Sequence, residues 1–125
     1  MKLLRSAAAA LLFFAGAAHA QQVGPPAWIN DLGLSAAQQE QVFKIFYAIE
    51  PLIRERLLAA RQAHEELEDL AIAVSLNSDE GRTAFEAEAQ ALGDVAQIRL
   101  HASQAVYQLL TQEQRARVAR LPNYE

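Results

Sequence analysis

The chain has 125 residues, with 15 acidic and 11 basic side chains and a net charge of −4. A surface of this charge does not attract nucleic acid or anionic lipid head groups, so we expect no partner of either class. Because the chain has no cysteine, disulfides, thiol nucleophiles and thiolate metal ligands are excluded.

The first 20 residues have the three-part pattern of a secretory signal peptide. Lys2 and Arg5 make a positive start, residues 7–18 are apolar, and residues 18–20 read Ala-His-Ala, with small residues where a signal peptidase cuts. The apolar run is about a dozen residues, whereas a membrane-spanning helix needs about 20. We therefore expect cleavage before Gln21, a periplasmic location and a processed chain that does not span the membrane. Without Lys2 and Arg5, nine basic side chains remain against 15 acidic ones, a net charge of −6.

The rest of the chain predicts an all-α fold. Residues 21–34 contain two glycines and two prolines, which predicts an extended lead-in with one helical turn near Trp28. Two long helical stretches follow, over residues 35–74 and 79–109, with a turn near residue 77 and a short last helix that ends before Pro122. No sustained alternation of apolar and polar residues indicates a strand. The two long stretches are expected to pair as a hairpin.

The first long stretch carries one apolar stripe, and the second carries more apolar surface than one neighbour covers. The stripe keeps its phase from Val42 to Val74, across Pro51, so we expect one helix kinked at Pro51 rather than two helices. Arg56 falls within the stripe and requires an acidic partner or a path to solvent. The second stretch is apolar over about half of its circumference, which favours pairing with a second subunit or with another molecule.

A short motif with the pattern Leu-[Ser/Thr]-x-x-Gln occurs twice. Its key residues are Leu34, Ser35 and Gln38 in the first copy, and Leu110, Thr111 and Gln114 in the second. In each copy the hydroxyl can accept from the amide three residues on, while the glutamine reaches back to the amide of the cap residue. Such a cap stabilises a helix start by about 1 kcal/mol. The two leucines have no apolar partner for a hydrophobic staple, so we expect them in the core.

A repeat of this kind, in an exported helical chain, resembles the Spy/CpxP family of periplasmic proteins, which is defined by two Leu-Thr-x-x-Gln motifs. The chain is also similar to the related CnrX-like periplasmic heavy-metal sensors. The resemblance covers residues 34–121 and is strongest over residues 106–115, and Ser35 replaces the usual threonine. It implies a hooked helical hairpin over residues 35–121, flanked by short helices and dimerising with a second copy, with residues 122–125 as a tail.

The resemblance implies an ATP-independent chaperone or envelope-stress accessory protein, without a cofactor. Partners would be unfolded or aggregation-prone envelope proteins, a membrane sensor kinase in the CpxP-like case, and a second copy of the chain. Candidates for the client or dimer surface are Phe43, Phe46, Tyr47 and Ile49. Phe46 and Ile49 also follow the Val42 stripe, whereas Phe43 and Tyr47 form a second apolar face about 100–140° away. The alternative is that this second face packs beneath Trp28 or within a dimer interface. Spy and CpxP have basic concave surfaces, whereas this chain is acidic and offers only a local strip at Arg54, Arg56 and Arg61.

The runner-up function is a heavy-metal-binding sensor, with His64 and Glu68 as the candidate ligands. Their i,i+4 spacing supplies half a site. A turn near residue 77 places His64 opposite residue 91, so one subunit does not bring His64 and His101 to the same ion, and a site across a dimer stays open. Catalysis is not expected, because His101 and Ser103 point in different directions and no nucleophile, acid and base converge.

Overall fold

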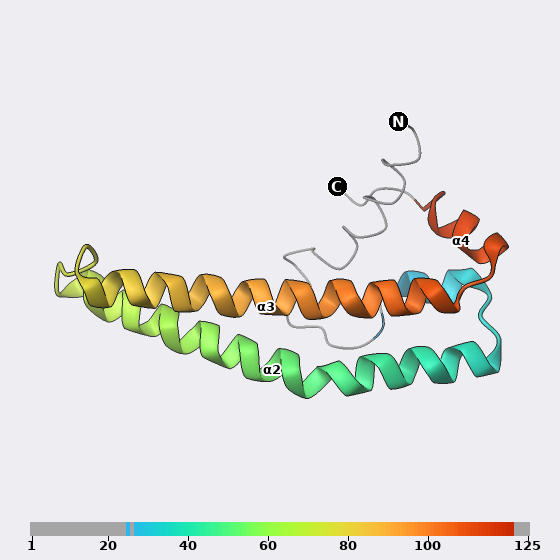
Figure 1. The fold of residues 1–125 in the computed structure, drawn as a ribbon, viewed down its shortest axis with the longest axis horizontal. Coiled ribbons are helices and arrows are strands. Elements are labelled where there is room, and N and C mark those ends of the chain that lie inside the picture. Colours follow the sequence, from blue (N-terminus) through green and yellow to red (C-terminus); the bar gives the residue numbers. More distant parts are fainter. Residues whose placement is uncertain (1–24, 26, 122–125) are drawn as a thin grey trace. The chain divides into compact units, whose positions relative to one another are not determined.

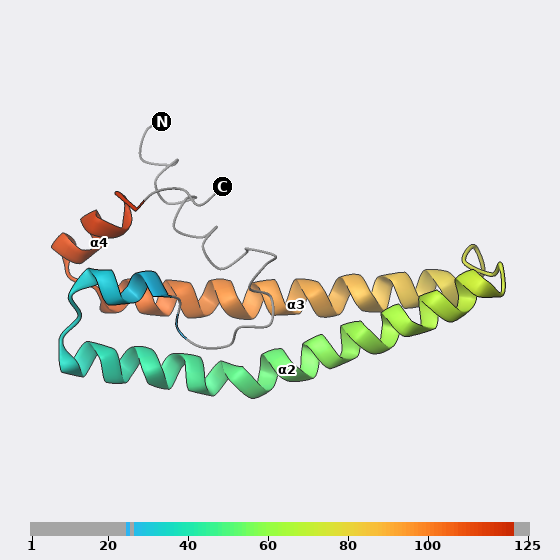
Figure 2. The same ribbon diagram turned by 180° about the vertical axis from the view of Figure 1, so that it is seen from behind.

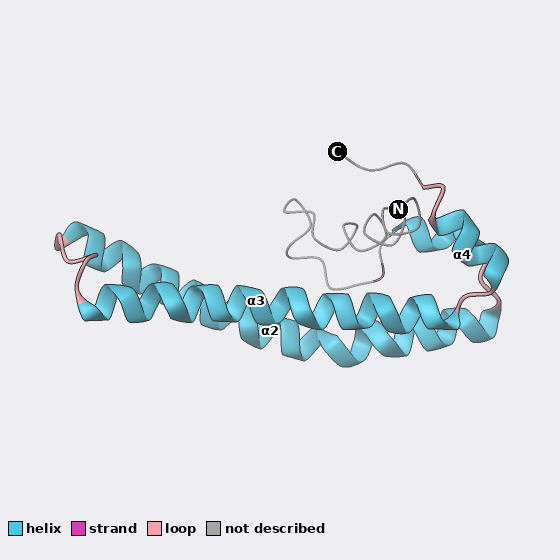
Figure 3. Ribbon diagram, turned by 45° about the horizontal axis from the view of Figure 1, so that its top comes forward, coloured by secondary structure: helices cyan, strands magenta, loops and turns pink. Residues whose placement is uncertain are grey.

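The computed structural model describes Pro25 and residues 27–121, except for the side chains of residues 27 and 28. The expected signal peptide, the tail at residues 122–125 and the side chain of Trp28 lie outside this part. Within it the elements are the 3-10 helix η2 (Ala27–Leu32) and the α-helices α2 (Ala36–Ile72), α3 (Asp79–Leu109) and α4 (Gln112–Val118) (Figure 1). The described residues contain no strand (Figure 3), so the all-α prediction is confirmed.

Helix α2 continues without interruption through Pro51, as the unbroken apolar phase predicts. A proline inside a helix removes one backbone hydrogen bond and crowds the preceding turn. Pro51 lies on the exposed side of α2, where water can replace the lost donor. The lead-in is more regular than expected, because η2 covers six residues rather than one turn near Trp28.

The described chain divides into two compact units, and both long helices contribute to each of them. Unit 1 combines Pro25 and residues 27–50 with residues 99–121, and unit 2 is residues 51–98. In unit 1 the beginning of α2 packs against the end of α3, and η2 contacts α4 at the same end (Figure 2). One core cluster joins η2, α2 and α3 through Ile29, Val42, Phe46 and Val106. A second cluster joins Leu32, Leu110 and Val118.

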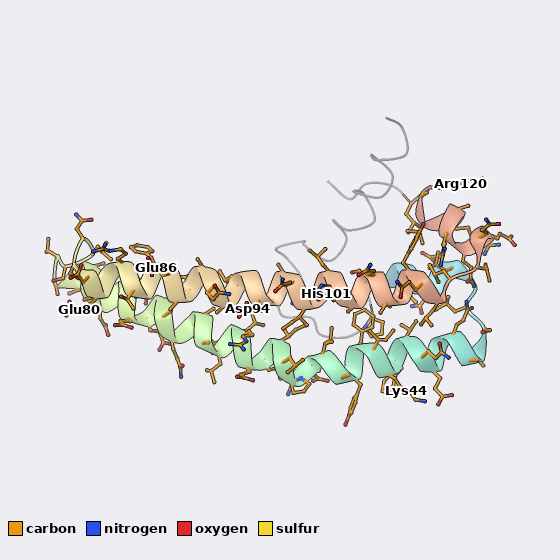
Figure 4. The ribbon with its side chains drawn as sticks, in the orientation of Figure 1. Lys44, Glu80, Glu86, Asp94, His101 and Arg120 are labelled. Carbon is orange, nitrogen blue, oxygen red and sulfur yellow. The ribbon has the colours of Figure 1, made fainter. Side chains whose placement is uncertain are left out.

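Unit 2 is an antiparallel pair made of the rest of α2 and the first part of α3. Its buried residues are mainly small: Ile53, Ala60, Ala63, Leu67, Ala84, Ala91 and Val95. Alanines at a helix contact let two backbones approach closely, but each buries little apolar area. Arg56, the charged residue within the stripe, pairs at 3.6 Å with Asp94 of α3, which supplies the acidic partner that its position requires. Figure 4 labels Asp94 on α3.

The turn of unit 2 begins with a Schellman motif at the end of α2. The Ser75 amide donates to the Leu70 carbonyl (2.8 Å), and the Val74 amide donates to the Ala71 carbonyl (3.1 Å). Val74 occupies the position of this motif that usually holds glycine, and its φ is 57°. Ser78 then begins α3, because its hydroxyl accepts from the Gly81 amide (3.1 Å). None of the described helices has both the length and the apolarity that crossing a membrane requires.

Candidate functional site

The first repeat caps α2 as its pattern predicts. The amide of Gln38 donates to the Ser35 hydroxyl (3.1 Å), and the Ser35 amide donates to the Gln38 side-chain oxygen (2.9 Å). These are the two reciprocal hydrogen bonds of a capping box. They satisfy two backbone donors that the helix itself leaves without a partner.

The second repeat caps α4 with the same geometry. The Gln114 amide donates to the Thr111 hydroxyl (3.2 Å), and the Thr111 amide donates to the Gln114 side-chain oxygen (2.9 Å). Thr111 is in the extended conformation of an N-cap residue. A helix of seven residues has little stability by itself, so this cap and the packing of Val118 hold α4 in place.

The two glutamines also bind each other, which sequence reasoning did not anticipate. The Gln38 side-chain nitrogen donates to the Gln114 oxygen (2.8 Å), and the Gln114 nitrogen donates to the Gln38 oxygen (3.0 Å). Each nitrogen also donates to the carbonyl of the residue before the opposite motif: Gln38 to Leu109 (2.9 Å) and Gln114 to Gly33 (3.3 Å). Both amides thus use every donor and acceptor that they have.

The residues beside the two motifs make further contacts where the motifs meet. Leu110 is buried with Leu32, and Leu34 packs against both core clusters of unit 1, as expected for leucines that lack a staple partner. Gly33 adopts a φ of 64°, in the left-handed region that favours glycine. The Leu32 carbonyl, just before it, accepts from the Arg117 guanidinium (3.3 Å). The repeated motif therefore joins the first turn of α2 to α4 and to the chain that enters α2.

The candidate client surface divides into an exposed half and a buried half. Phe43 and Tyr47 are 61% and 68% exposed, and their rings stack with centroids 5.9 Å apart. The assignment of Phe46 to a client or dimer surface is wrong, because Phe46 is only 4% exposed and belongs to a core cluster. Ile49 is half-buried and packs against that cluster. The reason is helix phase: both residues follow the Val42 stripe, whereas Phe43 and Tyr47 lie about 100–140° away.

A groove lies beside Phe43, one member of the exposed aromatic pair. Its lining includes Phe43 of α2 and Ile29 of η2. Leu34 adds to the apolar part of the lining, while Asn30 and Gln39 contribute polar side chains. Phe43 therefore connects the aromatic pair to a surface that has both apolar and hydrogen-bonding character.

The candidate metal ligands His64 and Glu68 lie in unit 2, where a third residue joins them. The His64 ring contacts Glu88 of α3 through Nδ1 (3.1 Å) and Glu68 through Nε2 (3.4 Å). The hydrogen bond and the charge of Glu88, with a smaller contribution from Glu68, raise the pKa of His64 above its ordinary value. Both ring nitrogens thus face carboxylates. Among the described residues no group of three or more His, Cys, Asp or Glu side chains is arranged to hold a metal ion.

The acidic charge of the protein is concentrated in unit 2. Residues 51–98 contain ten acidic and four basic side chains, a net charge of −6. The described part of unit 1 contains four acidic and five basic side chains, a net charge of +1. The three arginines of the expected positive strip all lie in the acidic unit, and Arg56 among them is paired with Asp94.

Comparison with known proteins gives no match among protein-family models, curated proteins or solved structures. The Spy/CpxP resemblance therefore depends on the two motifs and their setting alone.

Proposed function

We propose that this chain is a periplasmic, ATP-independent chaperone or envelope-stress accessory protein of the Spy/CpxP type. Its partners in this proposal are unfolded or aggregation-prone envelope proteins, and it acts without a cofactor. The amino-terminal pattern of residues 1–20 supports export. The two capping boxes support membership of the Spy/CpxP type, because each copy of the motif begins a helix and the two copies hydrogen-bond to each other.

The observation that carries the proposal is the exposed, stacked pair Phe43 and Tyr47. Two aromatic rings on consecutive turns of α2 present a large apolar area to solvent. Exposed apolar surface of this kind marks an interaction site in a soluble domain. Contacts made by flat aromatic rings do not require one sequence in the partner, which suits a protein that holds many different unfolded chains.

The surroundings of the pair fit the same use. Glu40 and Lys44 lie next to it in helical phase and form an exposed i,i+4 ion pair at 3.0 Å, which contributes little stability. The described part of unit 1 carries almost no net charge, so electrostatic repulsion does not restrict which unfolded chains approach it. The metal-sensor alternative gains no comparable support, because the carboxylates of Glu68 and Glu88 occupy both ring nitrogens of His64.

The proposal is tested by the suppression of aggregation without ATP. The protein is mixed with a chemically denatured, acidic protein that aggregates on dilution, and light scattering is followed. We expect suppression at a severalfold excess of the chain. The double variant Phe43→Ser/Tyr47→Ser should lose most of it, whereas Gln41→Ser/Ala48→Ser, exposed positions on another side of α2, should keep it. No suppression by the unchanged protein, or equal loss in both double variants, would contradict the proposal.

Export is tested separately by mass spectrometry of the periplasmic fraction. The expected mass is that of a chain beginning at Gln21. Recovery of the full-length chain from the cytosol would contradict a periplasmic role.

A further inference from the structure

Unit 2 has an apolar groove that neither the repeated motifs nor the aromatic pair explains. Its floor and walls are formed by Leu67 of α2, Leu76 of the turn, and Phe85 and Leu92 of α3. Phe85 and Leu92 are 52% and 48% exposed, and both line the groove beside the buried residues of α3. They are seven residues apart with Ala89 between them, so the apolar strip on α3 extends over about 10 Å.

Carboxylates stand at the edge of this groove. Glu68 of α2 and Glu88 of α3 both line it, and His64 lies between them with one ring nitrogen towards each. Glu88 is the less exposed of the two carboxylates, with 25% of its side chain accessible. The surrounding unit has a net charge of −6, so the potential at the groove favours a cation.

This charge decides between the two kinds of occupant that fit an apolar groove. A second copy of unit 2 would bring six further net negative charges to a surface that is already acidic, which opposes symmetric pairing through this groove. A segment with apolar side chains on one face and lysine or arginine beside them matches the groove in both respects. Its apolar side chains contact the apolar lining, and its basic side chains pair with the carboxylates. Amphipathic helices bind grooves in this way, with apolar anchors at positions i, i+3 or i+4, and i+7.

We infer that the groove of unit 2 binds a cationic amphipathic peptide segment, whose apolar side chains contact Phe85 and Leu92 and whose basic side chains pair with Glu68 and Glu88. This is a second binding site, with a ligand chemistry of its own. It does not depend on the aromatic pair of unit 1, because the two surfaces share no residue.

The test is fluorescence anisotropy with the purified protein and a labelled 14-residue helical peptide of leucine and lysine. A peptide in which glutamate replaces every lysine serves as the matched probe. We expect micromolar binding of the lysine peptide at low salt and at least about tenfold weaker binding of the glutamate peptide. No binding of the lysine peptide at millimolar concentration, or equal binding of both peptides, would overturn the inference.

Variants separate the groove from a general effect of charge. Glu68→Gln/Glu88→Gln should weaken binding of the lysine peptide about fivefold or more. Glu66→Gln/Glu86→Gln removes the same charge outside the groove lining and should change the affinity less than about twofold. Phe85→Ser/Leu92→Ser should weaken binding about tenfold while circular dichroism stays helical. Equal effects of the two glutamate pairs would overturn the inference.

Two further measurements distinguish a peptide site in unit 2 from peptide binding in unit 1 and from self-association of the chain. The Phe43→Ser/Tyr47→Ser variant should bind the lysine peptide normally, even if it no longer suppresses aggregation, and loss of peptide binding in it would overturn the assignment to unit 2. The second measurement is the oligomeric state of the protein by sedimentation. If Phe85→Ser/Leu92→Ser dissociated a dimer and left peptide binding unchanged, the groove would be a subunit interface and the inference would fail.

Discussion

The side-chain amides of Gln38 and Gln114 hydrogen-bond to each other in both directions, at 2.8 and 3.0 Å, across 76 positions of sequence. Each glutamine is also the third residue after a helix cap. Its side chain therefore accepts from the nearby cap amide and also hydrogen-bonds to the distant glutamine. A capping box that uses glutamate could accept from the cap amide but could not donate to the opposite glutamine. The amide pair therefore explains why both motifs end in glutamine rather than glutamate.

Breaking this pair should destabilise the fold, and most of the loss should occur with the first substitution. Gln114→Leu leaves the Gly33 carbonyl and the Gln38 amide with fewer partners, and we expect it to lower the free energy of unfolding by about 2 kcal/mol. Gln38→Leu should act similarly, and the double variant should lose about 1 kcal/mol less than the sum. Urea unfolding followed by circular dichroism measures these values. Strictly additive losses, or an equal loss in the exposed control Gln62→Leu, would show that the pair is not coupled.

Replacing Val74 by glycine should stabilise the protein. The backbone there has a φ of 57°, which a β-branched residue adopts only at a cost, and the side chain is 92% exposed and buries almost nothing. We expect Val74→Gly to raise the free energy of unfolding by about 1 kcal/mol, and Val74→Ala to raise it less. The urea midpoint should shift while its slope stays constant. A destabilised Val74→Gly variant would mean that Val74 makes a contact in solution that outweighs the strain.

Two phenylalanines on neighbouring faces of α2 should respond very differently to truncation. Phe46→Ala removes a buried ring from the cluster with Val42 and Val106, and we expect a loss of about 3–5 kcal/mol. Phe43→Ala removes an exposed ring and should change stability by less than about 0.5 kcal/mol. Thermal and urea unfolding of the two single variants tests this contrast. Equal losses would mean that Phe43 is buried against another part of the protein or against a second copy.

The stability of unit 2 should depend on pH through the protonation of His64. Because Glu88 and Glu68 raise the pKa of the folded imidazole above its ordinary value near 6.5, their stabilising effect is complete below that value. It is lost as the pH rises through the folded-state pKa. In an NMR titration the His64 midpoint should fall in Glu88→Gln, and fall less in Glu68→Gln. An unchanged midpoint in Glu88→Gln, or a larger fall in Glu68→Gln, would exclude Glu88 as the main partner.

Helix positions were predictable because the signals that set them are local. The bounds of α3, Asp79–Leu109, coincide with the predicted stretch, and the Thr111 cap was visible as a four-residue pattern. The continuation of α2 through Pro51 followed from the phase of apolar residues on both sides of it. Each of these features depends on neighbours within a few turns of helix.

Features that depend on how two helices align were predicted less well. The turn places His64 beside Glu88 rather than opposite residue 91, so the third member of that group was missed. Arg56 was expected to need an acidic partner, but only the packed pair identifies Asp94. The mutual hydrogen bonds of the glutamines require both motifs to meet at one end of unit 1, which no local pattern specifies. The left-handed Val74 was missed because glycine, its usual signal, is absent there.

The most direct test of the proposed function is site-specific photo-crosslinking to an unfolded protein that cannot refold. A photoreactive phenylalanine derivative is placed at position 43, at position 47, or at the exposed control position 41. We expect positions 43 and 47 to capture the unfolded protein and not its folded form, while position 41 captures neither. Equal capture from all three positions, or capture only of a second copy of the chain, would contradict a client-binding role for the aromatic pair.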